Sequence, residues 1–87
     1  MPATRADIVA ILTDSEFTRA EKQLLECQFP NVCQPSNFIE KLFALLYACD
    51  DGNLRKMEAA FPDHVAAVRC WSIGDLAQRI RAKGCDV

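Results

Sequence analysis

FIEKLFALLYAC, residues 38–49, is the stretch of this 87-residue chain that decides its fold. Only two of its side chains are charged, so a helix built from it would be apolar over most of its circumference. Ser36 precedes it as a candidate N-cap, and the turn signal DDGN, residues 50–53, follows it. These signals predict a hydrophobic helix over about residues 37–50, which we expect at the centre of the domain.

Shorter helical segments are expected on both sides of this stretch. Capping-box patterns, apolar residues at spacings of three and four, and prolines or glycines at the ends indicate their limits. Two successive capping-box patterns begin at Thr13 and Thr18, and we favour a start near residue 14 for the second helix. No segment alternates apolar and polar residues between hairpin turns, so no sheet is expected. The expected helices cover about residues 7–12, 14–28, 37–50, 54–61, 63–71 and 73–83.

The sequence therefore predicts an all-α fold, a compact bundle of about five or six short helices packed around the central helix. A chain of this length forms one domain, residues 1–87, with one modest core. Apolar residues make up 51% and charged residues 25%, which is typical of globular rather than disordered chains. The longest uncharged run, residues 42–49, is far shorter than the ~20 residues of a membrane span. We expect a soluble, cytoplasmic protein with no membrane partner.

The cysteine pattern favours reduced thiols over a disulfide framework or a metal site. The five cysteines are Cys27, Cys33, Cys49, Cys70 and Cys85. Their number is odd, no pair has CxxC spacing, and most lie within or beside apolar segments. A zinc site would need closely spaced ligands, and the chain has a single histidine. Free cysteines in a reducing compartment are expected, although pairings of Cys33 or Cys85 stay open.

No catalytic or cofactor motif is present in the sequence. A nucleophilic cysteine needs a base beside it, and only His64 could serve. We expect His64 to be exposed at a helix start, although folding could bring it to Cys33. The turn at residues 50–53 lacks the spacing of a calcium loop, and three scattered glycines form no phosphate loop. The sequence predicts no enzyme, no cofactor and no metal.

Charge is unevenly distributed along the chain. Residues 1–51 carry a net charge of −4, whereas residues 52–87 carry +2. The basic residues that could contact nucleic acid are Arg69, Arg79, Arg81 and Lys83. Strong non-specific binding typically takes about six to ten phosphate contacts, so these four cations favour a solvated basic face over a nucleic-acid contact. A helix-turn-helix-like DNA-binding regulator using the basic helix at 73–83 is the alternative hypothesis.

The leading hypothesis is a small interaction module or regulator that docks onto a larger protein or a second copy of itself. Six short helices are not expected to hide every aromatic side chain, and exposed aromatics are typical anchors of interfaces. We expect Phe38, Phe43 and Phe61 in the core, and Ile73 on the inward side of the last helix. The predicted partner-binding residues are Phe29, Glu40, Tyr47, Asp50 and Asp51.

Overall fold

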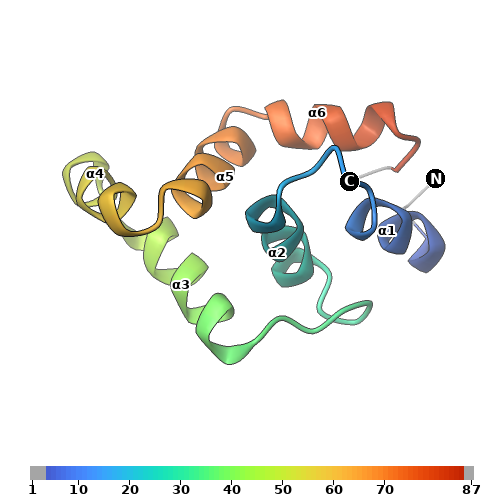
Figure 1. Ribbon diagram of the computed structural model, residues 1–87, viewed down its shortest axis with the longest axis horizontal. Helices are drawn as coiled ribbons and strands as arrows, with labels where there is room; N and C mark the ends of the chain where they lie inside the picture. The colour runs from blue at the N-terminus through green and yellow to red at the C-terminus, as the bar shows by residue number, and fades with distance from the viewer. Residues whose placement is uncertain (1–3, 86–87) are drawn as a thin grey trace.

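The computed structural model describes residues 4–85, which form six α-helices and no strand (Figure 1). The helices are α1 (Arg5–Leu12), α2 (Arg19–Gln28), α3 (Asn37–Ala48), α4 (Asp51–Ala60), α5 (Pro62–Ser72) and α6 (Asp75–Ala82). The Cα radius of gyration is 12.8 Å, close to the roughly 12 Å of a compact chain of this length. The predicted all-α bundle of short helices is confirmed.

Side-chain caps define where the first four helices begin. Thr4 and Thr18 each head a complete capping box, in which the threonine and an acidic residue satisfy each other's backbone N–H groups. Ser36 and Asp50 accept hydrogen bonds from the backbone N–H three residues ahead, at 3.3 and 2.8 Å. Each such cap typically stabilises a helix by about 1 kcal/mol. The two prolines of residues 29–36 then fall in the connection between α2 and α3.

Two expected helix starts were wrong, because other residues supply the caps. The second helix begins at Arg19, with Thr18 as its N-cap, rather than near residue 14. Thr13 instead ends α1, and its hydroxyl donates to the carbonyl oxygens of Val9 and Ala10 at 3.1 Å. In the fourth helix, Asp50 is the N-cap. The DDGN segment, residues 50–53, is therefore a helix start and not a separate turn.

The connection between α5 and α6 also differs from the expectation. Gly74 adopts the left-handed conformation, with φ of 82°, and is the N-cap of α6 without a side-chain hydrogen bond. Ser72, which precedes the expected helix at 73–83, is the last residue of α5. Ile73, expected to face inward, lies in this tight connection and is 79% exposed. The helix that buries Leu76 and Ile80 thus starts two residues later than its apolar pattern suggested.

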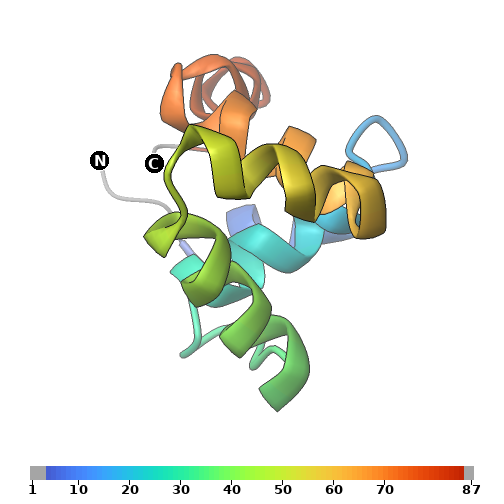
Figure 2. The ribbon, with the colours of Figure 1, turned by 90° about the vertical axis from the view of Figure 1, so that its left-hand side faces the viewer.

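The helix in contact with the most neighbours is α5. It packs against α2, α3, α4 and α6, whereas α3 packs mainly against α2 and α5. In Figures 1 and 2, α3 and α4 accordingly form one side of the molecule and α1 lies on the other. The hydrophobic stretch is a helix close to its expected limits, but the central position, which we assigned to it, belongs to α5. Val65, Ala67 and Val68 are the buried side chains that α5 places there.

A single cluster of buried side chains joins five of the six helices. Its members are Ile8, Ile11, Phe17, Ala20, Leu24, Leu25, Ile39, Leu42, Phe43, Leu46, Val65, Ala67, Val68, Leu76, Ile80 and Cys85. None of them comes from α4, which has no buried residue. The apolar residues of α4, Leu54 and Met57, are only half-buried. None of the helices in the described chain has the length and apolar character to cross a membrane.

Candidate binding surface

Two large apolar side chains stand out from the same flank of α3. Phe38 is 62% exposed and Leu45 is 52% exposed. They are seven residues apart, about two helical turns, so they share one side of the helix. The core-facing stripe of α3 uses other positions, Ile39, Leu42, Phe43 and Leu46. The expectation that Phe38 is a core residue was therefore wrong, while Phe43 is buried as expected and Phe61 is half-buried.

A cleft separates this flank of α3 from α4. Its volume is about 320 Å³, and its walls are Leu45, Ala48, Cys49, Asn53, Lys56 and Met57. Beyond it, the ring of Phe38 lies 6.2 Å from the ring of Phe61, centroid to centroid. We call the surface formed by Phe38, Leu45, Cys49, Met57 and Phe61 the α3–α4 face.

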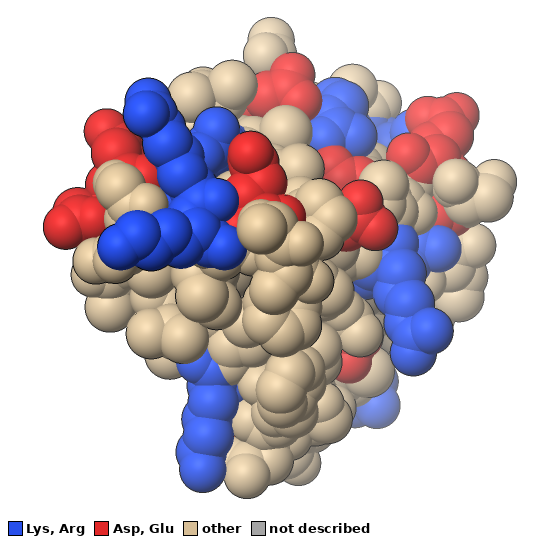
Figure 3. Space-filling view, turned by 60° about the vertical axis from the view of Figure 1, so that its left-hand side comes forward, with Lys and Arg blue, Asp and Glu red and all other residues tan. Residues whose placement is uncertain are grey.

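Charged side chains surround the α3–α4 face without covering it. Figure 3 shows an uncharged area in the lower middle of this side of the molecule, with charged side chains above it and on both its edges. Lys56 lines the cleft, and Lys41 precedes Leu45 by one helical turn. Both lysines are exposed, and neither forms an ion pair within residues 4–85.

Of the predicted partner-binding residues, Glu40 and Tyr47 lie on the opposite flank of α3, beside α2. Glu40 lies close to Cys27 of α2: burial raises the pKa of the Cys27 thiol, and the nearby charge of Glu40 raises it further. Burial likewise raises the pKa of Tyr47, which lies next to Cys27 and Gln28. Tyr47 is 46% exposed and Phe29, the residue that ends α2, is half-buried. Both aromatics are thus partly exposed, as expected.

Asp50 and Asp51 lie elsewhere, at the corner between α3 and α4. The carboxylate of Asp50 accepts the backbone N–H of Asn53 at 2.8 Å, so its acceptor is used inside the fold. Asp51 lines a second cleft of about 420 Å³ between α4 and α5, whose other walls include Arg55 and Ile73. The structure therefore does not gather the predicted partner-binding residues into one surface. They fall into a group beside α2 and a group at the start of α4.

Arg69, Arg79 and Lys83, basic residues of the nucleic-acid hypothesis, form ion pairs within the molecule. The pairs are Arg69–Glu58 at 3.6 Å, Arg79–Glu21, Arg79–Asp75 at 3.1 Å, Lys83–Asp14 at 3.3 Å and Lys83–Glu16 at 2.7 Å. Arg81 is exposed. These pairs join α4 to α5, and α6 to α2 and to the segment before it. Their cations are therefore partly neutralised by carboxylates that lie close by.

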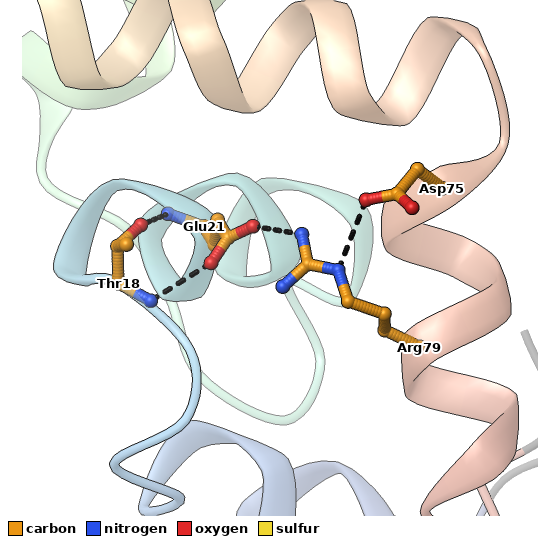
Figure 4. Close-up of polar contacts among 4 residues, drawn as sticks. All are labelled: Thr18, Glu21, Asp75 and Arg79. Carbon is orange, nitrogen blue, oxygen red and sulfur yellow. Dashed lines mark hydrogen bonds and ion pairs between the residues drawn. The ribbon is translucent and has the colours of Figure 1, made fainter.

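The contact between Arg79 and Glu21 is the most buried of these pairs (Figure 4). The Glu21 carboxylate accepts the backbone N–H of Thr18 at 2.9 Å and also binds the Arg79 guanidinium. Only 6% of Glu21 is exposed. Burial acts to raise the pKa of Glu21, but the hydrogen bonds from Arg79 and Thr18 and the charge of Arg79 together lower it below its ordinary value of 4.5. The role of this pair is to fasten α6 to α2.

The polar groups considered for catalysis have partners unsuited to it. The Cys33 thiol donates to Glu26 at 3.6 Å, and burial together with the Glu26 charge raises its pKa, which disfavours the reactive thiolate. His64 donates from Nε2 to Gln23 Oε1 at 2.7 Å and lies 5.6 Å from the Phe43 ring. The expectation of a solvent-exposed His64 was therefore wrong, because the ring is half-buried.

Metal-ligating side chains are scattered in the structure. Among the described residues, no group of three or more histidine, cysteine, aspartate or glutamate side chains lies close enough to hold a metal ion. Cys27, Cys33, Cys49 and Cys70 are free thiols, and Cys85 is buried in the core.

Sequence reasoning missed Phe38, Leu45 and Met57 as surface residues, although a signal was present. On a helix, Phe38, Leu45 and Cys49 fall together on one side, outside the stripe that Ile39 and Leu46 share. A helix with two apolar sides has more apolar surface than its contact with the core can cover, so one side is expected to stay exposed. No protein-family model, curated protein or solved structure matches this chain, so the α3–α4 face is assigned on its geometry alone.

Proposed function

We propose that this protein is a small non-enzymatic interaction module that docks onto a larger protein through the α3–α4 face. One observation carries the proposal: Phe38 and Leu45 are both more than half exposed on the same side of α3. They continue into a cleft whose other wall, α4, has no buried residue. Adjacent exposed apolar side chains rimmed by polar residues are typical of protein-binding surfaces, and aromatic side chains are frequent anchors there.

The proposal is also supported by how the reactive groups are used. The thiols of Cys27 and Cys33 have raised pKa values, and His64 donates to an amide rather than orienting a nucleophile. These arrangements favour a binding role over catalysis. We further propose a reducing compartment, the cytoplasm, because the cysteines are odd in number and lack CxxC spacing.

The nucleic-acid alternative has weaker support than docking to a protein. Arg79 and Lys83 would have to exchange their carboxylate partners for phosphates, and the chain carries a net charge of −2. A titration of mixed-sequence DNA at low ionic strength tests this alternative directly. Salt-dependent association that is lost with Arg81→Glu would favour it over docking through the α3–α4 face.

The test of the docking proposal is a quantitative comparison of baits in a native lysate. The wild type is compared with Leu45→Asp, which places a charge in the α3–α4 face, and with the matched control Val9→Asp. Val9 is 44% exposed on α1, which lies on the other side of the molecule. We expect captured proteins that are lost with Leu45→Asp and retained with Val9→Asp. Identical captured sets for all three baits would contradict the proposal.

Docking onto a second copy predicts a different result. Light scattering coupled to size-exclusion chromatography at high micromolar concentration would then report a dimer that Leu45→Asp dissociates. A monomer at all concentrations leaves the docking to a different protein as the remaining form of the proposal. Thermal unfolding followed by circular dichroism verifies in each case that the variants fold.

A further inference from the structure

The α3–α4 cleft has apolar walls and two nearby lysines that form no ion pair within the described residues. Leu45, Cys49 and Met57 supply the apolar walls, and Lys56 stands among them. Lys41 lies one turn before Leu45 on the same side of α3. We infer that the segment docked there is an acidic amphipathic helix, with apolar side chains in the cleft and carboxylates at Lys41 and Lys56. This inference rests on the proposed function.

The carboxylates near the cleft do not neutralise these two lysines. Asp50 is occupied as the N-cap of α4. Glu58 pairs with Arg69 and so lies on the α5 side of α4, while Glu40 lies on the α2 side of α3. An apolar cleft with unpaired cations at its edges therefore attracts negative charge, although the whole chain is acidic.

The dimensions of the cleft suit a short helix. Residues 41 to 48 of α3 extend over about 10 Å, or two helical turns. A helix lying along this length presents apolar side chains at positions i, i+3 or i+4, and i+7 to a groove, and its flanking positions reach the rim. Phe38 and Phe61 extend the apolar surface by a further turn. About three turns of a partner helix would therefore contact the α3–α4 face.

The other negatively charged ligands match this surface less well. Recognition of anionic lipid typically uses clusters of about four to eight cations, and nucleic acid about six to ten phosphate contacts. Two lysines that have no ion pair within residues 4–85, Lys41 and Lys56, border the α3–α4 face. A symmetric contact with a second copy would place Lys41 and Lys56 on both sides of the interface, because a twofold interface uses the same patch on both subunits. Like charges would then oppose each other.

The experiment is a selection from displayed helical peptides of about 16 residues, long enough to cover the α3–α4 face. Apolar positions vary among Leu, Ile, Phe and Met, and polar positions vary among Glu, Lys and Gln. Binders are selected on the wild type and counter-selected on Leu45→Asp, so that only peptides that need the cleft remain. We expect Glu to be enriched over Lys at positions flanking the apolar stripe.

The selected peptides are then measured by fluorescence anisotropy. Lys41→Glu/Lys56→Glu should weaken binding at least about fivefold. A rise from about 50 to about 300 mM NaCl should weaken wild-type binding in the same direction. The matched control Arg5→Glu/Arg19→Glu changes the net charge equally but on α1 and the start of α2, and should leave the affinity within about twofold.

The outcomes separate a failure of this inference from a failure of the proposed function. Neutral or Lys-rich peptides that depend on Leu45 would overturn the acidic partner and leave docking at the α3–α4 face intact. Binding to vesicles with about 30% phosphatidylserine, but to no peptide, would overturn it in favour of lipid. A dimer that Leu45→Asp dissociates would overturn it in favour of a second copy. If no peptide distinguishes the wild type from Leu45→Asp, the inference is wrong, and the lysate comparison then decides the proposed function separately.

Discussion

Arg79 of α6 binds the carboxylate of Glu21, the residue that also completes the capping box of α2. Residues 58 positions apart in the chain are thereby joined at a helix start. Arg79 additionally holds Asp75 at 3.1 Å, and its guanidinium carbon lies 5.7 Å from the centre of the Phe17 ring. One arginine thus ties together two helices and the segment that precedes α2.

Arg79→Leu should destabilise the protein, because it leaves the buried Glu21 carboxylate without its counter-charge. Arg79 itself is 39% exposed in its side chain, which reduces the expected loss in the free energy of unfolding to about 2 kcal/mol. Urea denaturation measures the difference. Arg55→Leu is the control: Arg55 is exposed and forms no ion pair within residues 4–85, so its loss should stay within about 0.5 kcal/mol. Equal effects of the two variants would contradict the assigned role.

Acid should weaken the fold partly through Glu21. Because its pKa in the folded protein lies below 4.5, the stability it contributes is present above that pH and is lost as pH falls through the lower, folded pKa. Asp7 and Asp14, whose pKa values backbone hydrogen bonds also lower, add to the wild-type dependence. The quantity to compare is therefore the difference between the wild type and Glu21→Gln.

Thermal midpoints between about pH 6 and about pH 3 should fall less steeply for Glu21→Gln than for the wild type. The glutamine can still accept the Thr18 N–H, so the variant keeps the cap and removes the titrating charge that pairs with Arg79. Parallel curves would show that Glu21 does not contribute to the acid sensitivity.

His64 should titrate below its ordinary value of 6.5. Burial lowers its pKa; the charge of Asp63 opposes this effect, and that of Arg19 assists it. The unfolded chain takes up a proton near pH 6.5, whereas the folded protein does so only at lower pH. The free energy of unfolding therefore declines as pH falls from 6.5 to the folded pKa, and below that pKa His64 causes no further change with pH. His64 is the only histidine, so its NMR signal needs no assignment. A measured pKa at or above 6.5 would contradict the half-buried, neutral ring.

Phe38 and Phe43 make a matched pair for testing the orientation of α3. Phe43→Ala should cost about 3–5 kcal/mol, because it empties a fully buried site. Phe38→Ala should cost at most about 1 kcal/mol, since its ring is mostly exposed and the aromatic contact it loses is the one with Phe61. Urea denaturation of both variants measures the two losses in the free energy of unfolding. Similar losses would mean that both phenylalanines are buried, which would contradict this orientation of α3.

Gly74 and Gly52 should respond oppositely to alanine. Gly74→Ala forces a side chain into the left-handed conformation and should cost about 1 kcal/mol, although no atom lies within 4 Å of the added Cβ. Gly52 lies in the first turn of α4, and its Cβ would meet only Asp50 Oδ1, at 3.6 Å. Gly52→Ala should therefore stabilise the protein by up to about 1 kcal/mol. The thermal midpoints should shift in opposite directions.

Local signals made the fold class predictable from the sequence. Caps such as Thr4 and Ser36, together with the prolines between helices, define helices through contacts within three or four residues of the chain. Where signals compete, the sequence alone was insufficient. Thr13 and Thr18 present the same pattern, and only the use of the Thr13 hydroxyl at the end of α1 decides between them.

The candidate surface depended on long-range packing and was largely unpredictable. Which apolar side of α3 is covered depends on where α2 and α5 pack, and those contacts join segments far apart in the chain. The half-buried ring of His64 has a hydrogen-bond partner, Gln23, that lies 41 residues away in the chain. The split of the predicted partner residues has the same cause, because Glu40 faces α2 whereas Asp50 begins α4. The partial exposure of Tyr47 was predictable, because it depends on the side of α3 that Tyr47 occupies.

The absence of any buried side chain in α4 also affects the dynamics of the molecule. A helix held by half-buried residues and by one exposed ion pair to α5 detaches at a lower free energy than the helices whose side chains fill the core. Its amide hydrogens should exchange with solvent well before those of α5. A ligand seated between α3 and α4 would then slow that exchange selectively, and part of its binding free energy would be spent on ordering α4.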